Sequence, residues 1–309
     1  MLEIKLFGTG EINYLCKKIA IPLHQLPGQL FCYLVLNRDH PQNRERLAET
    51  FWSDITTTES RKYLRKSLWQ LQRALSDMID QGADQVLIVE PEYLQVNPRA
   101  NLWIDVAEFE GRYQDVINLR GSELNSNQYA NTQKTIELYQ GDLLEGWYQD
   151  WCLLERERYK EIYLNLIDKL MGYCEAHNQY EAGIYYGRKI LKYDRTHERT
   201  HLRMMRLNYL AGDRVSAIRQ YICCRNALHE ELDVEPGVEI QKLYEKVIRD
   251  GMETSQFYTS FVTEKDLIEL NGIRKSLKRV LEMLSGQDSI RLQILEEIKS
   301  IEAAIEKQY

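Results

Sequence analysis

Proline and glycine are scarce in this sequence of 309 residues, which contains 6 prolines and 16 glycines. Collagen-like chains and low-complexity disordered chains are much richer in these two residues. The longest unbroken apolar run, Leu30–Leu36, is far shorter than the roughly 20 residues that a membrane-spanning helix needs. Met1–Gly10 also lacks the basic stretch followed by an apolar stretch that marks a secretory signal. We therefore expect a folded, soluble, cytoplasmic protein without membrane contact.

Cysteine and positive charge are also limited. The 6 cysteines form no CxxC pair and no spacing typical of metal ligands, so we expect reduced, half-buried thiols and predict no metal and no cofactor. The net charge of −7 argues against indiscriminate coating of nucleic acid, but it permits one local basic surface on a single domain. The length allows two or three domains, so the charge has to be judged segment by segment.

The first hundred residues change pattern several times. Residues 2–7 alternate apolar and charged side chains like a half-buried strand. Helical segments follow at 30–36, from about Asn43, and at 57–78, where Leu64, Leu68, Leu71 and Leu75 recur at helical spacing. Two extended runs, 85–89 and 93–96, flank Glu90-Pro91-Glu92 and predict a hairpin. This order predicts an α/β winged helix-turn-helix domain over residues 1–98.

The pattern after Trp103 is almost wholly helical, so the fold class is mainly α. Helical segments are predicted near 105–119, 128–139, 151–177, 180–193, 197–211, 214–230 and 237–250. Tyr180-Glu181-Ala182 is echoed by Val215-Ser216-Ala217 35 positions later, close to the tetratricopeptide period of about 34 residues. We predict a tetratricopeptide-like (TPR-like) α-helical bundle over residues 103–250, in which small residues let paired helices approach.

The last part of the chain predicts a linker followed by a C-terminal helical hairpin or coiled coil. Residues 251–263 lose periodicity, and residues 264–309 carry two apolar stripes at helical spacing. Helices with one apolar face must cover it. Homodimerisation through this hairpin and its packing within the same chain remain equal alternatives.

The candidate site is the predicted helix from Thr57, which concentrates basic residues against the single acid Glu59. Arginine and lysine neutralise phosphates, and arginine or glutamine reaches base edges in the major groove. Charge alone favours a solvated helix face, but the third helix of a winged helix is the position that enters DNA and reverses that preference. The candidate DNA-binding residues are Thr57, Thr58, Ser60, Arg61, Lys62, Arg65, Lys66, Gln70, Arg73 and Tyr93. Tyr93, on the predicted wing, is at least as well explained by packing.

Specific motifs in both halves of the chain resemble a known family. In the first half they are Glu45-Arg46-Leu47-Ala48-Glu49-Thr50-Phe51-Trp52, Leu64-Arg65, Leu71-Gln72-Arg73-Ala74-Leu75 and Tyr93-Leu94-Gln95-Val96-Asn97. In the second half they are Ile104-Asp105-Val106, Phe109-Glu110, Gly141-Asp142-Leu143-Leu144, Trp151, Glu198 with His201, Tyr209-Leu210-Ala211-Gly212-Asp213 and Leu228-His229-Glu230-Glu231-Leu232-Asp233-Val234-Glu235-Pro236-Gly237. The first set resembles the OmpR-type winged helix and the second the bacterial transcriptional activator domain. Together they resemble the Streptomyces antibiotic regulatory proteins (SARPs).

The resemblance implies a non-enzymatic transcriptional regulator, most often an activator. By that resemblance it would bind direct repeats beside a promoter in double-stranded DNA and recruit RNA polymerase. The homodimer is suggested instead by the apolar stripes within residues 264–309. The start of the helix at Thr57 would also help to seat a phosphate. Gln72 replaces a usual arginine, and Asp233 replaces a usual glycine. No GxxxxGK[ST] motif occurs in the sequence, so regulation would act through the helical region or the C-terminal hairpin. The helical region is also a candidate to bind a small-molecule or peptide signal.

Two other functions compete with this interpretation. His197-Glu198-Arg199-Thr200-His201 matches HExxH, in which two histidines hold zinc and the glutamate acts as a general base. A zinc hydrolase would also need a third ligand, and only His229 follows downstream. The overall acidity also fits a TPR-like adaptor whose winged helix binds protein instead of DNA. Salt-dependent DNA affinity would separate the adaptor from the regulator.

Overall fold

The computed structural model describes residues 1–15, 17–18, 23–76, 85–259, 275 and 298–299. Contacts between residues divide the chain into two units, Met1–Pro236 and Gly237–Tyr309. Most elements are helices, and the strands lie in the first 104 residues, which confirms the predicted mainly α fold class. None of the described helices is both long enough and apolar enough to span a membrane.

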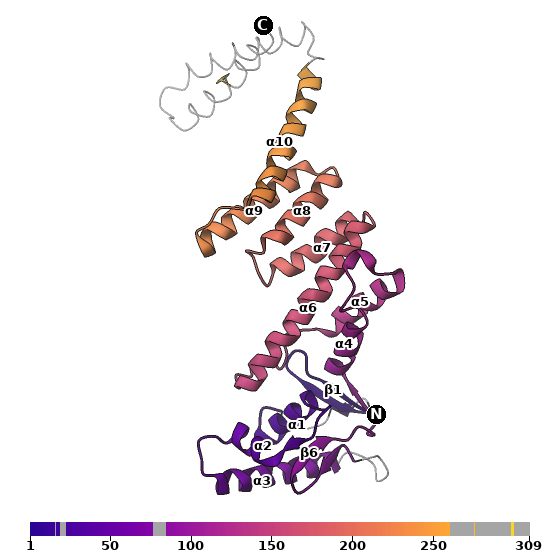
Figure 1. Cartoon of the computed structure of the whole chain (residues 1–309), viewed down its shortest axis with the longest axis vertical. Helices are drawn as coiled ribbons and strands as arrows, with labels where there is room; N and C mark the ends of the chain where they lie inside the picture. The colour runs from indigo at the N-terminus through magenta and orange to yellow at the C-terminus, as the bar shows by residue number, and fades with distance from the viewer. Residues whose placement is uncertain (16, 19–22, 77–84, 260–274, 276–297, 300–309) are drawn as a thin grey trace. The chain divides into compact units, whose positions relative to one another are not determined.

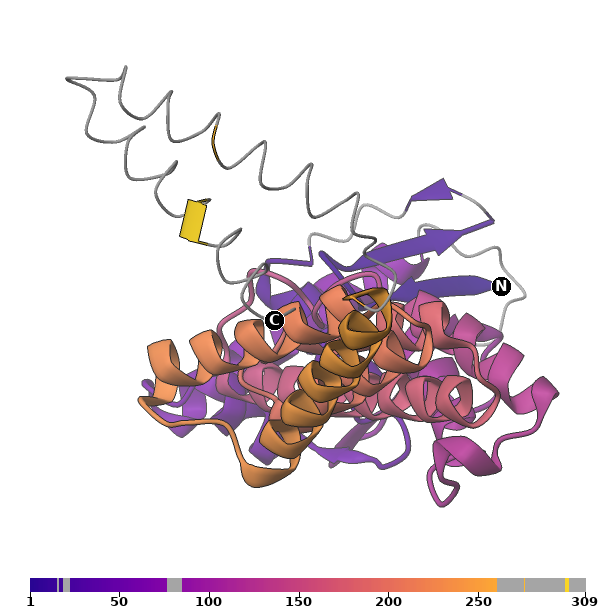
Figure 2. The ribbon, with the colours of Figure 1, turned by 90° about the horizontal axis from the view of Figure 1, so that it is seen from above.

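The winged-helix order predicted from the sequence is confirmed in the first unit. Its elements are β1 (Leu2–Lys5), β2 (Glu11–Tyr14), β3 (Lys17–Lys18), α1 (Leu26–Leu36), β4 (Gln42–Asn43), α2 (Arg44–Phe51), α3 (Thr57–Ser76), β5 (Leu87–Val89), β6 (Tyr93–Val96) and β7 (Leu102–Ile104). The strands form two sheets, ordered β3-β2-β1-β7 and β4-β6-β5. Figure 1 shows α1, α2 and α3 together at one end of this unit, and Figure 2 shows the indigo strands side by side at its edge.

The core of the winged helix comes from the predicted apolar positions. Leu64, Leu68, Leu71 and Leu75 of α3 are all buried, as their helical spacing predicts. Leu2 and Ile4 of β1 are buried, whereas Glu3 and Lys5, which alternate with them along the strand, are partly exposed. The predicted strand over 2–7 ends at Lys5 in the structure. Strand β7 pairs in parallel with β1, so residues just after the wing complete the N-terminal sheet.

The second part of the first unit is a succession of packed helices. They are α4 (Asp105–Gln114), η1 (Gly121–Glu123), α5 (Ser126–Leu138), α6 (Asp150–Ala176), α7 (Tyr180–Leu191), α8 (Glu198–Leu210) and α9 (Arg214–Leu232). Each of α7, α8 and α9 packs on the helix before it. Gly187 lets α7 approach α8 closely, because a Cβ at this position would lie 2.5 Å from Cγ of Met204. The short break at Ala211-Gly212-Asp213 separates α8 from α9, as expected from the sequence.

The second unit begins with α10 (Val238–Thr259). The sequence pattern predicts a helix over 237–250 and a linker over 251–263, but residues 251–259 continue the helix. This stretch contains no proline and only Gly251, so nothing in it forces the backbone out of the helix. The predicted C-terminal hairpin over 264–309 lies outside the described residues, apart from 275 and 298–299.

A partly buried ion network joins the winged helix to the helices that follow it. The carboxylate of Glu110, on α4, pairs with Arg38 after α1 and with Arg158 on α6, the latter at 2.6 Å. Burial opposes ionisation of Glu110, but hydrogen bonds and charge from Arg38 and Arg158 outweigh it and lower its pKa below the ordinary 4.5. One carboxylate on α4 therefore binds an arginine from the turn after α1 and an arginine on α6, which gives Phe109-Glu110 a structural role.

We expect Glu110→Gln to lower the free energy of unfolding by about 1–2 kcal/mol at pH 7, between the values for exposed and buried ion pairs. Because the pKa of Glu110 is lowered in the folded chain, its contribution is present above pH 4.5 and is lost as the pH falls further. Urea unfolding of the full chain should be measured from pH 7 to pH 3. The difference in the free energy of unfolding between wild type and variant should shrink as the pH falls. Glu108→Gln, which removes a more exposed carboxylate from the same helix, is the control. A difference that does not change with pH would contradict the prediction.

Candidate nucleic-acid interface

Helix α3 presents one buried and one exposed face. Ser60, Ser67 and the leucine stripe face the core, whereas the exposed face carries the basic side chains predicted from the sequence. The exposed candidates on this helix are Thr57, Thr58, Arg61, Lys62, Arg65, Lys66, Gln70 and Arg73. The sequence therefore places eight of its ten candidates on a single accessible surface, which we call the α3 face.

The other two candidates lie elsewhere. Ser60 is only 3% exposed, and its hydroxyl donates to the carbonyl of Thr57 at 3.0 Å, so its side chain faces the core. Tyr93 is half-buried on β6 and pairs with Asn43 of β4. Gln72, which replaces a usual arginine, is half-buried beside the leucine stripe. Helical spacing alone did not distinguish Ser60 from Arg61, because small polar residues are compatible with either face.

The start of α3 is less favourable to phosphate than the sequence suggests. The Thr56 hydroxyl donates to the carboxylate of Glu59 at 2.8 Å, and the Glu59 amide donates back to that hydroxyl at 3.4 Å. This reciprocal cap satisfies one of the amide groups that an anion would otherwise use. It also places a negative charge at the position where the helix dipole would attract phosphate. Phosphate binding on α3 therefore depends on its side chains.

The basic side chains of the α3 face differ in their partners. Arg61 forms an ion pair with Glu45 of α2. The guanidinium of Arg73 lies over the Trp69 ring, 5.5 Å from its centroid, and this indole is itself exposed. Lys62, Arg65 and Lys66 make no ion pair with any residue that the structure describes. These three cations are the ones most available to an anionic partner.

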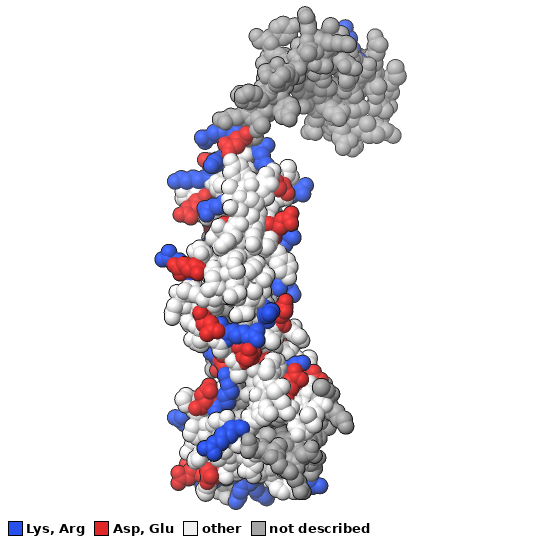
Figure 3. Space-filling view, turned by 90° about the vertical axis from the view of Figure 1, so that its right-hand side faces the viewer, with Lys and Arg blue, Asp and Glu red and all other residues white. Residues whose placement is uncertain are grey.

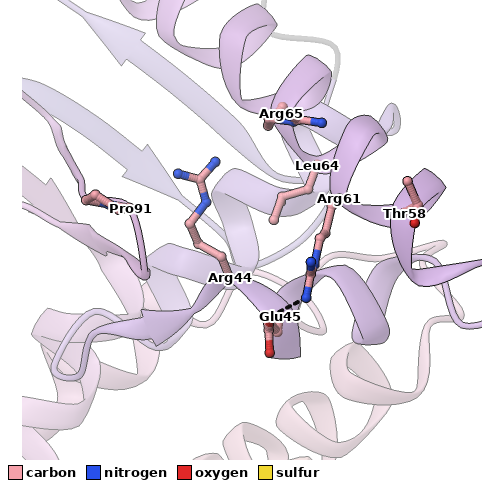
Figure 4. A pocket seen from close by; sticks show the side chains of 7 residues that line it. All are labelled: Arg44, Glu45, Thr58, Arg61, Leu64, Arg65 and Pro91. Atoms are coloured by element: carbon pink, nitrogen blue, oxygen red, sulfur yellow. Dashed lines mark hydrogen bonds and ion pairs between the residues drawn. The ribbon is translucent and has the colours of Figure 1, made fainter.

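A hollow of about 520 Å³ lies where α2, α3 and the turn between β5 and β6 meet (Figure 4). Its lining residues are Arg44, Glu45, Thr58, Arg61, Leu64, Arg65 and Pro91. Arg44 is the first residue of α2, and its Nη1 donates to the carbonyl of Glu90 at 3.1 Å. The sequence pattern did not identify Arg44, although the capping Asn43 directly before it marks the start of a helix. Arg44 therefore places a positive charge from α2 next to the α3 face.

Charge is mixed on one face of the first unit. Figure 3 shows acidic and basic side chains interspersed along the face turned to the viewer, without a large area of one sign among the described residues. Any attraction to nucleic acid is therefore local to the winged helix and does not come from the protein's net charge.

The HExxH residues are held by neighbours that satisfy them. His201 is buried, with Nε2 at 2.9 Å from the carbonyl of Arg195 and Nδ1 at 2.6 Å from the side-chain amide of Gln220. Burial lowers the pKa of His201, although these hydrogen bonds oppose it, so the neutral ring is favoured. His197 contacts the Thr200 hydroxyl through Nδ1. Within the described residues, no group of three or more histidine, cysteine or acidic side chains is placed to hold a metal ion. These contacts give the motif a structural role at the start of α8.

Five aromatic residues of the helical region that could line a ligand groove differ in their exposure. Trp147 and Tyr186 are buried, Trp151 and Tyr209 are half-buried, and Tyr185 is exposed. A separate hollow of about 370 Å³ lies along α4 and α5. Its lining is polar apart from Val116, and none of those aromatic residues belongs to it. Binding of a small molecule or peptide in the helical region stays a prediction.

Comparison with known proteins supports both halves of the architecture. The family model of the bacterial transcriptional activator domain matches residues 104–248. The fold is similar to that of EmbR from Mycobacterium tuberculosis, whose structure was solved in complex with a low-affinity phosphopeptide. The TM-score is 0.57 at 16% identity, and the match covers 84% of this chain and 70% of that one. Comparison with curated proteins finds no match. At this identity the likeness to EmbR shows the fold alone.

Proposed function

We propose that this chain acts by sequence-specific binding to double-stranded DNA. It carries a bacterial transcriptional activator domain behind a winged helix and is a transcriptional regulator of the SARP kind. The observation that carries the proposal is the α3 face, where Lys62, Arg65 and Lys66 are exposed without ion-pair partners in the described part of the chain. In this proposal α3 enters the major groove and the β5–β6 hairpin is the wing.

The remaining parts of the proposal follow from the SARP resemblance. Residues 1–98 are the DNA-binding domain, residues 103–250 contact RNA polymerase, and activation occurs in the cytoplasm from direct repeats near a promoter. Homodimerisation, with residues 264–309 as one candidate contact, would raise the effective concentration of one winged helix beside another. We propose no enzymatic activity for the chain. The TPR-like adaptor remains the second candidate because the chain is acidic overall.

The test is DNA binding by the full chain before and after removal of two cations of the α3 face. Genomic footprinting supplies the best site, and Arg65→Ala/Arg73→Ala should then weaken binding to it about 30-fold, or about 1 kcal/mol for each contact. Arg188→Ala/Arg206→Ala removes the same charge from exposed positions on α7 and α8 and should change the affinity little. Discrete sites lost only in the first variant would support the regulator. Absence of enriched sites would favour the adaptor.

A further inference from the structure

The hollow beside α3 contains three arginines whose charges are compensated to different degrees. Arg61 is held in its ion pair with Glu45 (Figure 4). Arg44 gives one hydrogen bond to the Glu90 carbonyl, which carries no net charge and leaves further guanidinium donors. Arg65 has no ion-pair partner among the described residues. Two of the three positive charges in this hollow are therefore not neutralised.

The backbone around the hollow leaves little capacity to bind an anion. At the start of α2, the amide of Arg44 donates to the Glu92 carbonyl at 3.0 Å. The next two amides, of Glu45 and Arg46, both donate to Oδ1 of Asn43. Pro91 has no amide hydrogen, and Leu64 contributes a buried apolar floor. An anion in this hollow would be bound by the guanidinium groups and not by a helix N-terminus.

The arginines come from two separate elements, the first turn of α2 and the second and third turns of α3. Guanidinium groups bind phosphate oxygens with directed hydrogen bonds, so a phosphate held from two directions would fix how α3 is oriented. The volume of about 520 Å³ has room for a phosphodiester group with its water. Backbone phosphates position a protein on the duplex without reading its sequence.

We propose that this hollow holds one backbone phosphate of bound DNA between Arg44 and Arg65, and that Glu45 restrains Arg61 and weakens the contact. The inference rests on the proposed function. It assigns Arg44 a positioning role that the sequence pattern did not indicate, and it makes Glu45 an acid that lowers DNA affinity. Phosphate has to compete with the Glu45 carboxylate for Arg61, and it also meets the negative charge of that carboxylate.

The experiment measures DNA affinity of the full chain as a function of salt concentration. Each phosphate contact contributes about 0.9 to the slope of log K against log salt, so Arg44→Gln should make the slope shallower by about that amount. Arg44→Lys keeps the charge and should retain most of the slope. Glu45→Gln should tighten binding about threefold, because it removes the acid and releases Arg61. Arg206→Gln, a single exposed charge on α8, is the control and should leave the slope unchanged.

The outcomes separate this inference from the proposed function. If the wild-type chain binds no DNA, the proposed function fails first. If the wild type binds DNA but Arg44→Gln and Glu45→Gln leave slope and affinity unchanged, only the phosphate contact is overturned. Thermal unfolding of each variant shows whether loss of the hydrogen bond to Glu90 has unfolded the wing. If Arg44→Gln is folded and its slope of log K against log salt equals that of the wild type, the inference is contradicted. Binding of inorganic phosphate that depends on Arg44, at constant ionic strength and without a change in DNA slope, would identify a free-anion site and also overturn it.

Discussion

Replacement of Asp105 by alanine is expected to lower the free energy of unfolding of the chain by about 4 kcal/mol. Asp105, the first residue of α4, is only 3% exposed. Its carboxylate accepts from the amides of Leu6 at 2.8 and 2.9 Å and of Phe7 at 2.9 Å, and also from Val106 at 2.7 Å. Alanine would leave these three amides without their acceptor, at about 1–3 kcal/mol for each buried donor. The loss should therefore be among the largest for a single side chain of this chain.

The loss should come from the amides and not from the charge of Asp105. Burial raises the pKa of Asp105, although its hydrogen bonds to Phe7, Leu6 and Val106 oppose the rise. Ionisation in this place is therefore costly, and the carboxylate is retained because it supplies several acceptors. Asp105→Asn keeps one oxygen but turns an NH₂ group toward an amide donor, so it should lose more than half as much as alanine. Urea unfolding at pH 7 measures both losses.

Asp115→Ala is the matched control, because it removes an exposed aspartate just after the same helix. It should change stability by less than about 0.5 kcal/mol. A loss below about 1 kcal/mol in Asp105→Ala would show that water or a shifted backbone group replaces the carboxylate. The role of Asp105 as the acceptor for the end of β1 would then be wrong.

The sequence predicted the elements whose residues repeat a local pattern. Leu64 and Leu71 of α3 lie on the buried stripe, and residues 180–191 and 214–232 form helices close to their predicted bounds. Helical periodicity depends on neighbours three or four residues apart, so it can be read from the chain. The pairing of β7 with β1 joins residues about 100 positions apart, and three residues in a row carry no comparable pattern. The continuation of α10 past Asp250 depends on the absence of a stop signal, which is weaker evidence than a stop itself.

For the candidate site, too, the sequence predicted the local pattern but not the contacts between elements. Charge spacing placed Arg61, Arg65 and Arg73 on one accessible face, and the structure has all three exposed. It did not show that Arg61 pairs with Glu45, because that acid lies on another helix, 16 residues away in the chain. Nor did it find Arg44, whose place beside α3 depends on how the wing meets α2. The sequence shows where the cations are on a helix, but which of them are free to bind an anion depends on contacts between elements of the fold.

Replacement of Trp151 by alanine is expected to destabilise the chain by about 3 kcal/mol, the lower end for a tryptophan because this one is half-buried. Trp151, on α6, packs its ring against Tyr33 of α1 at 5.3 Å and against Phe51 of α2 at 6.1 Å between centroids. Phe51 in turn contacts Trp52, which stacks on Tyr63 of α3 at 6.5 Å. These rings connect α6 with all three helices of the winged helix.

Because Trp151 touches both α1 and α2, its loss should loosen the winged helix more than the distant helices. Amide hydrogen exchange of the full chain should therefore accelerate in α1 and α2 while α8 and α9 remain protected. Tyr148→Ala removes an aromatic ring that is 79% exposed near the same end of α6, and should leave both stability and exchange nearly unchanged. Trp151→Phe keeps a ring in place and should recover part of the loss. Uniform acceleration over α1, α2, α8 and α9 would mean that Trp151 stabilises the whole unit equally. The ring contacts would then not be a joint between the winged helix and the helices that follow it.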